Sequence, residues 1–286
     1  MKKVVIILTC FNRKEKTTKC IQSLAAAQVP DCHFVYLVVD DCSTDGTEAA
    51  LLQLANEQQL SITVIQGTGS LFYTGGMNRG MVTARAQFQD ADAYMLINDD
   101  VQFDSEALAQ MVTDAFAQQV GRSEQQNRTA GVFVGATRDD AGKFSYGGVR
   151  YIKGIRYIPV KPEDADRSCD TFNANCVLVP RQIFDDVAVM DTAYMHSMGD
   201  FDYGLRIHKK GYPIMVYDRY IGVCNKNAVE GSWNDRTLSR KERFALKESN
   251  KGLPRKEWFH FLNRNFGFGT AVVRSITPYI RIVLGK

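Results

Sequence analysis

The sequence predicts an α/β fold in which helices flank a mixed, mostly parallel sheet, with a mainly helical extension after residue 230. Short apolar, β-branched runs recur along the first hundred residues, helical patterns separate them, and two of the runs end on adjacent aspartates. A continuous apolar run is typical of a strand buried on both faces. Alternation of strands and helices favours a parallel sheet with right-handed crossovers.

The first four strands and the three helices between them follow directly from these patterns. The predicted strands are KVVIILT (3–9), HFVYLVV (33–39), SITVIQ (61–66) and AYMLIN (93–98). Helical spacing predicts helices over 13–27, 44–60 and 76–88. Ser43, Thr44 and Asp45 can cap the second helix, because their side-chain oxygens accept hydrogen bonds from the free amides of a first turn.

Beyond residue 100 the alternation loosens, although single elements remain recognisable. A helix is expected over 104–118, a polar loop over 121–129, and a strand over 130–137. Asp/Gly turns predict hairpins within 138–160, and Pro180 should end a strand that begins near 175. A short helix should follow Gly199, with Gly211 just beyond its end and a last strand after it.

Composition indicates a soluble enzyme-sized chain. Its 286 residues are 45% hydrophobic and 23% charged, which suffices for a normal core without disulfides. The seven cysteines are scattered and form no C-x-x-C pair, so reduced thiols and a cytoplasmic location are expected. Neither a secretory signal nor a membrane-spanning run is recognisable, and the glycosylation sequon at Asn127 is taken as chance.

Charge divides the chain into an acidic body and a basic tail. Residues 236–286 hold twelve Lys and Arg against three Glu, a net charge of +9, whereas residues 1–235 carry −6. We therefore expect a main domain over 1–230 and a helical extension over 231–286. Two interpretations of the extension stay open. It can rest on an anionic membrane surface, or its apolar residues can dock on the body or form a homodimer contact around Trp258, Phe259, Phe261 and Leu262.

Two pairs of acids follow predicted strands, at Asp40–Asp41 and at Asp99–Asp100. Ligands of parallel sheets bind beyond the carboxyl ends of the strands, so both pairs should share one edge and one ligand. Adjacent carboxylates can hold Mg²⁺ or Mn²⁺ together with substrate phosphates. The alternative for the second pair is a polar turn, with Asp104 and Ser105 capping the next helix.

A third acidic cluster, GDFDYGLRIHKKGY, opens the short helix after residue 198. N-capping would account for at least one of its acids, Asp200 and Asp202. The other could be a metal ligand or a general base, because a helix N-terminus favours an ionised carboxylate.

Several common chemistries are excluded by missing motifs. The sequence contains no G-x-x-x-x-G-K-[ST], G-x-G-x-x-G, G-x-S-x-G or H-E-x-x-H. A nucleotidyltransferase would carry a Gly-rich loop after its first strand, where this chain has TCFNRKEK. Nucleic-acid binding is not favoured, because the body is acidic and the basic tail has few interleaved aromatic residues.

The acidic motifs, taken in order, resemble those of family 2 glycosyltransferases, inverting enzymes with a GT-A fold that use nucleotide-sugar donors. VVDDCSTDGT is the most specific match, and INDDV resembles the D-x-D element of that family. VVIILTCFNR, GSLFYTGGMNRGM and GDFDYGLRIHKKGY resemble its remaining motifs, over roughly the first 220 residues. The chain departs from the pattern at Asn98, in place of the first Asp of D-x-D, and at Gly199, in place of a Glu.

The resemblance implies a role for each matching residue. Asp200 would be the catalytic base and Asp100 the metal ligand. The implied nucleotide-binding residues are Thr9, Phe11, Arg13, Asp40, Asp41, Gly76, Asn78 and Asp99, with Asp41 on the base, Asp40 supporting its turn and Asp99 at the ribose and diphosphate. Tyr73 is expected to pack in the core, and His196 is expected at neither metal nor acceptor.

The implied reaction moves a sugar, a hexose or deoxyhexose, from a nucleotide-diphosphate donor to an acceptor hydroxyl with inversion. Mg²⁺ or Mn²⁺ would be the cofactor. A saccharide or lipid-linked saccharide would be the acceptor, in surface polysaccharide synthesis on the inner face of the membrane. The alternative is a non-catalytic subunit that binds nucleotide sugars on the same fold; the presence of Asp200 favours an enzyme.

Overall fold

Four parallel strands form the half of the sheet that the sequence specifies most directly. The computed structural model describes residues 1–124 and 131–286. β1 (Lys2–Cys10) lies between β2 (Cys32–Asp40) and β4 (Ala93–Ile97), and β3 (Ser61–Gln66) forms the outer edge. Residues 4–8 of β1 are entirely buried. The predicted strands are therefore confirmed, as is their parallel pairing.

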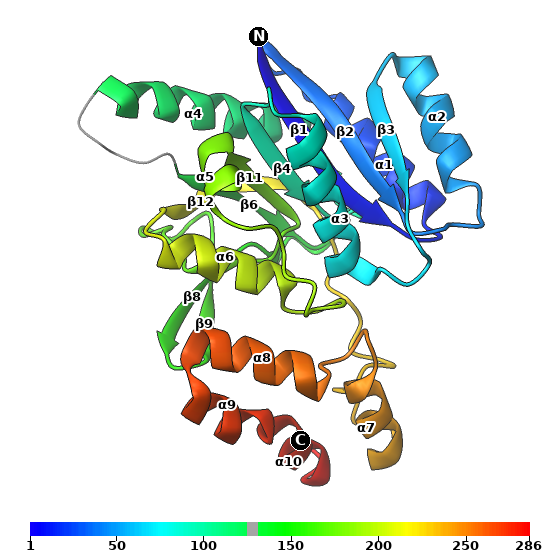
Figure 1. Ribbon diagram of the computed structural model, residues 1–286, viewed down its shortest axis with the longest axis vertical. Coiled ribbons are helices and arrows are strands. Elements are labelled where there is room, and N and C mark those ends of the chain that lie inside the picture. The colour runs from blue at the N-terminus through cyan, green and yellow to red at the C-terminus, as the bar shows by residue number, and fades with distance from the viewer. Residues whose placement is uncertain (125–130) are drawn as a thin grey trace.

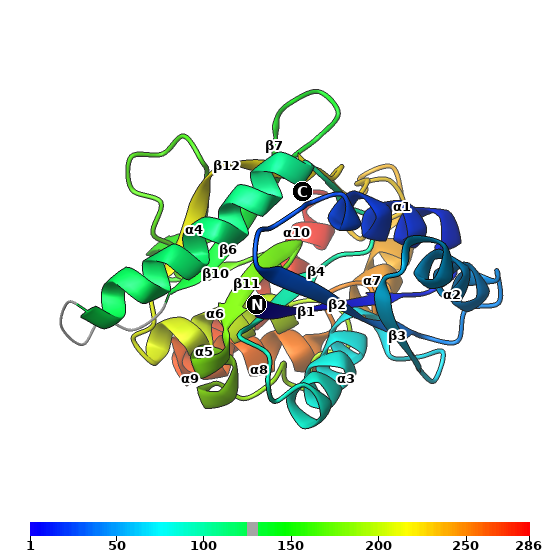
Figure 2. The same ribbon diagram turned by 90° about the horizontal axis from the view of Figure 1, so that it is seen from above.

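Helices cover both faces of this sheet (Figures 1 and 2). α1 (Lys14–Ala25), α2 (Thr47–Gln58) and α4 (Ser105–Glu124) pack on one face, where alternate β1 residues such as Ile6 point. α3 (Phe72–Gln87), α5 (Arg181–Asp186) and α6 (Gly199–Lys209) pack on the other face, against Ile7 and its neighbours. Each parallel strand is thus buried on both sides, which explains its uninterrupted apolar sequence.

Two predicted helix starts are wrong. α2 begins after Gly46, which has a φ of 81°, and no side chain caps it; Asp45 instead accepts from the Thr47 amide at 3.1 Å. α3 begins at Phe72, four residues before the predicted start, so Gly76 lies inside a helix. Its early start has a local cause: the Asp41 carboxylate accepts hydrogen bonds from the amides of Leu71 and Phe72.

The second half of the sheet is mixed. β11 (Cys176–Pro180) runs antiparallel between β4 and β6 (Val132–Arg138), and β12 (Ile214–Val223) follows parallel to β6. β5 (Gln102–Phe103) and β7 (Phe144–Tyr146) add short antiparallel edges. A separate small sheet consists of β8 (Gly148–Lys153), β9 (Arg156–Val160) and β10 (Thr171–Phe172). The strand ending at Pro180 and the hairpins over 138–160 are confirmed.

The remaining elements correct some boundaries. α4 extends to Glu124, six residues past its predicted end, into the segment predicted as a loop. The rest of that loop, with the sequon at Asn127, lies outside the described residues. α6 matches its prediction, and Gly211 follows it with a φ of 85°. Neither acid caps α6, because its N-cap is Met198 and no side chain accepts there.

The extension is helical, as predicted, and packs on the body of the protein. It contains α7 (Arg240–Glu248), α8 (Arg255–Phe266), α9 (Phe268–Ser275) and α10 (Thr277–Val283), at the bottom of Figure 1. Phe261 and Leu262 join Tyr194, Phe201 and Leu205 in a shared core. Phe261 and Leu262 are buried and therefore dock on the body. Trp258 and Phe259 are only partly buried, and a homodimer contact around them stays a prediction.

Candidate functional site

The acid pairs lie at one edge of the sheet, as expected. Parallel register places Cys10 at the end of β1 beside Asp40 at the end of β2. β4 pairs with the other side of β1. β4 ends at Ile97, so Asp99 and Asp100 lie two and three residues beyond its end. Since adjacent strands are about 4.8 Å apart, the two pairs are roughly two strand spacings apart.

Arg13 bridges the second acid pair. Its guanidinium lies 2.9 Å from an oxygen of Asp99 and 2.7 Å from an oxygen of Asp100. The Thr17 hydroxyl donates to the other Asp99 oxygen at 3.2 Å. The loop after β1 thus reaches the end of β4, and Arg13 neutralises part of the charge that two adjacent carboxylates would otherwise accumulate. Its place in a base pocket stays a prediction.

Asp99 and Asp100 have different surroundings. Burial raises the pKa of Asp99 to about 6, and the opposing charge of Arg13 only partly offsets it. Asp100 keeps 23% of its side chain exposed. Among the described residues, the second oxygen of Asp100 meets only the Cys224 thiol, a weak donor, at 3.5 Å. This oxygen is therefore the one in the pair best placed to meet a ligand.

The Asp99–Asp100 pair fits a divalent cation that binds together with a phosphate-bearing substrate. Within residues 1–124 and 131–286, no group of three or more His, Cys, Asp or Glu could hold a metal by itself. Mg²⁺, however, is commonly held by one or two carboxylates, with substrate phosphates completing its shell. Asp100 offers such a carboxylate oxygen, whereas both Asp99 oxygens are already occupied by Arg13 and Thr17. Asp100 as the metal ligand stays a prediction.

The first acid pair is built into the loops around it. An Asp40 oxygen accepts from the Ser43 amide at 3.0 Å, consistent with the expected support of the turn. Asp41 accepts from four backbone amides, those of residues 68, 69, 71 and 72. Both Asp41 oxygens are satisfied by this loop. A contact between Asp41 and a nucleotide base stays a prediction, and it would require one of these bonds to be released.

Three other predicted nucleotide-binding residues have identifiable structural partners. Thr9 donates to the Val39 carbonyl at 3.1 Å. A Cβ at Gly76 would lie 2.2 Å from the Thr9 hydroxyl oxygen, so only glycine lets α3 approach β1 this closely. The Asn78 amide donates to the Met190 carbonyl and ties α3 to the loop before α6. Phe11 remains 48% exposed, which leaves its ring free to meet a ligand.

Asp200 lies in the first turn of α6. One oxygen accepts from the Phe201 amide at 2.8 Å, and the other from the Ala174 amide at 3.2 Å. Burial raises the pKa of Asp200 to about 6, although these amides favour its ionised form. No cation pairs with it among the described residues. It is therefore an ionised, unneutralised carboxylate near pH 7, which is the state that a general base needs.

Asp202 has a structural role that the sequence did not indicate. Its side chain is completely buried and accepts from Arg206 at 2.9 Å, Asn265 at 3.0 Å and Tyr194 at 3.2 Å. Asn265 belongs to α8, so Asp202 joins α6 to the extension. Of the two acids of this cluster, only Asp200 is available for chemistry.

The glycine before Asp200 is explained by packing. A Cβ at Gly199 would lie within 2.3–2.9 Å of side-chain atoms of Thr74. Thr74 itself donates its amide to the Met195 carbonyl at 3.0 Å and its hydroxyl to the His196 carbonyl at 3.0 Å. α3 and the loop before α6 are thus held together at the point where α6 begins, and no larger residue fits there.

Three buried polar atoms near the acids have no hydrogen-bond partner: Asn98 Oδ1, the Tyr73 hydroxyl and His196 Nδ1. Tyr73 packs on the core as predicted, but its hydroxyl is unsatisfied. Burial and the charges of Asp200 and Asp100 raise its pKa, so it stays a donor. The His196 ring stands edge-on to Tyr73, with ring centroids 6.4 Å apart. Unpaired buried polar atoms are costly, and a bound ligand can satisfy them.

Sequence reasoning identified neither the Cys224 contact nor the unsatisfied Tyr73 hydroxyl, for physical reasons. Cys224, which faces Asp100, is a lone cysteine 124 residues further along the chain, and no local pattern marks it. Tyr73 sits in an apolar pattern that equally predicts core packing. The place of Asn98 near the acids could be found from the sequence, because Asn98 directly precedes the Asp99–Asp100 pair at the end of the same strand.

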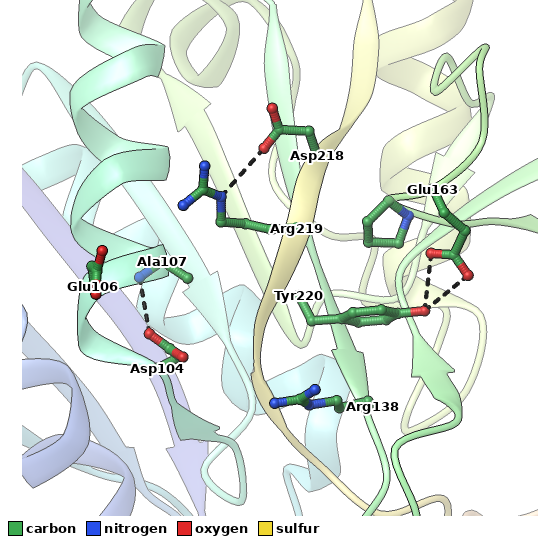
Figure 3. A pocket seen from close by; sticks show the side chains of 9 residues that line it. Asp104, Glu106, Ala107, Arg138, Glu163, Asp218, Arg219 and Tyr220 are labelled. Atoms are coloured by element: carbon green, nitrogen blue, oxygen red, sulfur yellow. Dashed lines mark hydrogen bonds and ion pairs between the residues drawn. The ribbon is translucent and has the colours of Figure 1, made fainter.

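A separate hollow of about 500 Å³ lies beside β12 and the start of α4 (Figure 3). None of the predicted site residues lines it. Some of its polar groups contact one another: Tyr220 donates to Glu163 at 3.2 Å, and Arg219 pairs with Asp218 at 3.6 Å. Because none of the acid pairs and no part of the Asp200 cluster lines this hollow, we assign it no part in the candidate site.

The first part of the chain is similar to a known protein family. Residues 5–121 match the family model "Glycosyl transferase family 2". No curated protein sequence matches the chain.

Solved structures are similar in fold at low sequence identity. The mannosyltransferase PcManGT from Pyrobaculum calidifontis, in complex with GDP-Man and Mn²⁺, has 14% identity and a TM-score of 0.58, over 99% of this chain and 73% of that chain. S. aureus TarS has 17% identity and a TM-score of 0.56, over 99% of this chain but only 49% of TarS. Its residues 1–349 with UDP-GlcNAc give 16% identity and a TM-score of 0.56, over 99% and 82% of the two chains.

Proposed function

Because residues 5–121 match the model of glycosyl transferase family 2, we propose that the protein moves a sugar from a nucleotide-diphosphate donor to an acceptor hydroxyl, with inversion at the anomeric carbon. The observation that carries the proposal is the state of Asp200. It is a carboxylate with a raised pKa, no cation beside it and two amides fixing its direction. A non-catalytic binding protein would have no use for such a group.

The proposed chemistry follows from the positions of the acids. Asp200 takes the proton of the acceptor hydroxyl as its oxygen attacks the anomeric carbon from the face opposite the diphosphate. The Ala174 and Phe201 amides keep the carboxylate in one orientation during this transfer. The bond from the anomeric carbon to the diphosphate breaks as the new glycosidic bond forms.

The donor is proposed to lie along the sheet edge between the two acid pairs. The loop after β1, with Phe11 and Arg13, adjoins both pairs, because Asn12 accepts from the Thr44 amide at 2.7 Å while Arg13 contacts Asp99 and Asp100. Mg²⁺ or Mn²⁺ at Asp100 would neutralise charge on the departing diphosphate. GDP-Man and UDP-GlcNAc, bound by the structural neighbours, are the first donors to screen.

The acceptor is proposed to be a saccharide or a lipid-linked saccharide used in surface polysaccharide synthesis. The rival function is a subunit that binds nucleotide sugars without transferring them. Slow donor hydrolysis, in which water replaces the acceptor, separates the two functions before the acceptor is known.

Asp200→Asn tests the proposal. The amide keeps the shape of the side chain but cannot take a proton, so turnover should fall by roughly 10²–10⁴-fold while the donor dissociation constant hardly changes. Calorimetry and donor hydrolysis measure the two quantities. Asp185→Asn, an exposed acid on α5, serves as the matched control and should change neither. Near-normal turnover in Asp200→Asn would remove this residue from the mechanism.

A further inference from the structure

The last two helices carry a concentration of exposed apolar side chains that the proposed chemistry does not explain. Fifteen large apolar side chains are exposed among the described residues, and seven of these lie between residues 268 and 284. The seven are Phe268, Val272, Val273, Ile276, Ile280, Val283 and Leu284. Single exposed apolar residues are ordinary, but a contiguous group marks an interaction surface.

One side of each helix is nevertheless packed. α9 buries Ala271 and Ser275 and packs on α8, and α10 buries Pro278 and Ile282 and packs on α7 and α9. Pro278 has no backbone N–H and cannot donate a helical hydrogen bond to the Arg274 carbonyl. This carbonyl instead accepts from the Trp258 indole at 3.3 Å. The outward apolar face is therefore fixed by packing on α8 rather than by a frayed chain end.

The β8–β9 hairpin adds exposed apolar side chains at the same end of the molecule. Ile152, Tyr157 and Ile158 are exposed. Tyr151 of this hairpin packs edge-on against Phe266, just before α9, with ring centroids 5.0 Å apart, and Figure 1 shows the hairpin beside the end of α8. We call the exposed residues of β8–β9 and α9–α10 together the basic apolar surface; it holds ten of the fifteen exposed large apolar side chains.

The charge of this surface has a single sign. Residues 148–160 and 267–286 contain six Lys and Arg and no Asp or Glu. These are Arg150, Lys153, Arg156, Arg274, Arg281 and Lys286. Within the described part of the chain, only Arg150 among them pairs with a side-chain carboxylate, that of Asp166 at 3.0 Å. The surface therefore presents apolar side chains together with five cations that pair with no side-chain carboxylate among the described residues.

The combination of exposed apolar side chains and cations favours one kind of binding partner for this surface. A second copy of the chain in a symmetric dimer would bring the same patch against itself, so that cations would face cations. An anionic lipid bilayer offers negative head groups to the cations and an apolar region to the valines and isoleucines. We propose that the basic apolar surface binds anionic membranes, with α9 and α10 lying in the plane of the interface.

The binding would be peripheral. No helix within the described residues is long and apolar enough to cross a bilayer. Because Asn265 at the end of α8 donates to Asp202 on α6, a membrane-bound surface would hold the Asp200 site in a fixed position relative to the lipid. In that position the Asp200 site would have access to a lipid-linked acceptor, a consequence that rests on the proposed function. The membrane binding itself does not depend on that function.

Vesicle co-sedimentation of the full chain, without donor or acceptor, tests the proposal. Vesicles of phosphatidylcholine with phosphatidylglycerol should bind the protein, and phosphatidylcholine alone should not. Val273→Ser with Ile280→Ser should lower the partition coefficient at least tenfold, because both side chains would enter the interface. Lys153→Gln with Arg156→Gln should lower it about fivefold for each cation and flatten its dependence on salt.

Matched controls come from the body of the protein. Val82→Ser on α3, where the valine is 51% exposed against 66% for Val273, should leave binding unchanged. Lys19→Gln on α1 should do the same. Equal binding to both kinds of vesicle, or none to anionic vesicles at low salt, overturns the proposal. So does a dimer, seen by sedimentation velocity, that Val273→Ser with Ile280→Ser separates. Because no substrate is present, these outcomes are independent of transferase activity.

Discussion

At the scale of single residues, two buried carboxyl groups set the pH range in which the site can work. Burial raises the pKa of both Asp200 and Asp99 to about 6. Both are expected to act as anions, Asp200 as a base and Asp99 beside the donor. Because their pKa values are raised, the active forms are present above pH 6 and are lost as the pH falls through that value.

The pH profile should reflect this. We expect kcat/KM to be nearly constant from pH 7 to 8 and to fall below pH 6, by more than tenfold per unit if both groups contribute. In Asp200→Asn, the remaining activity should depend on the ionisation of Asp99 alone, so it should fall less steeply as the pH is lowered. Donor hydrolysis across pH 5–8 measures both profiles. An unchanged rate at pH 5 would mean that neither carboxylate needs to be ionised.

Asp100 should determine the metal requirement. Of the adjacent acids Asp99 and Asp100, Asp100 is the one that is partly exposed and has an oxygen contacted by a weak donor, the Cys224 thiol. We expect a chelator to weaken donor binding at least tenfold in the wild type and to have no effect in Asp100→Ala, which should bind weakly in both conditions. Calorimetry with and without chelator makes the comparison.

Asp104→Ala is the control for this prediction. Asp104 is an exposed acid four residues further on, and it accepts from the Ala107 amide at the start of α4. Its loss should cost about 1 kcal/mol of stability without changing the metal effect. Equal donor affinity with and without chelator in the wild type would show that the acids bind the substrate directly or only shape the turn.

At the scale of elements, the close contact between α3 and the start of α6 positions the proposed base. Gly199→Ala would place a methyl group within 2.3–2.9 Å of Thr74 atoms. Since Thr74 is itself held by two hydrogen bonds, it cannot move freely. We expect the free energy of unfolding to fall by about 1–3 kcal/mol, as for other overpacked sites.

Urea unfolding measures this change, and two variants check its cause. Gly269→Ala on α9 adds the same methyl group where no atom lies within 4 Å, and it should be neutral or slightly stabilising. Thr74→Ala combined with Gly199→Ala should recover part of the loss, because the two side chains compete for one space. A stable Gly199→Ala would mean that α6 can shift at no cost.

At the scale of the whole molecule, Asp202 couples the extension to the catalytic part. It is fully buried, pairs with Arg206 and accepts from Asn265 on α8. Asp202→Asn would leave the Arg206 guanidinium without its anionic partner, at a cost of about 3 kcal/mol. We expect wild type and variant each to unfold in a single transition, because the two parts share the core that contains Phe261 and Leu262.

Urea unfolding followed by both circular dichroism and tryptophan fluorescence tests this coupling, because Trp233 and Trp258 both lie in the extension. The two signals should change at the same denaturant concentration. Fluorescence that changes first would show that the extension unfolds by itself and that its contacts with α6 are weak. Asp170→Asn, a partly exposed acid near His208, is the control and should lower stability much less.

By itself, the sequence determined the features of this protein that depend on short stretches of chain. The buried parallel strands, the acids at their ends and the helical extension all follow from runs of a few residues, because burial on both faces demands apolar continuity and strand ends tolerate charge. The family resemblance, carried by the same stretches, agrees with the match over residues 5–121.

Only the tertiary structure decided the contacts between distant residues. Arg13 meets Asp99 and Asp100 across 86 and 87 positions, Cys224 meets Asp100 across 124, and Asp202 meets Asn265 across 63. No periodicity records such pairs, because packing of whole elements brings them together. The start of α3 depended in the same way on the Asp41 carboxylate. The exposed apolar face of α9 and α10 depended on which side of each helix packs on α7 and α8.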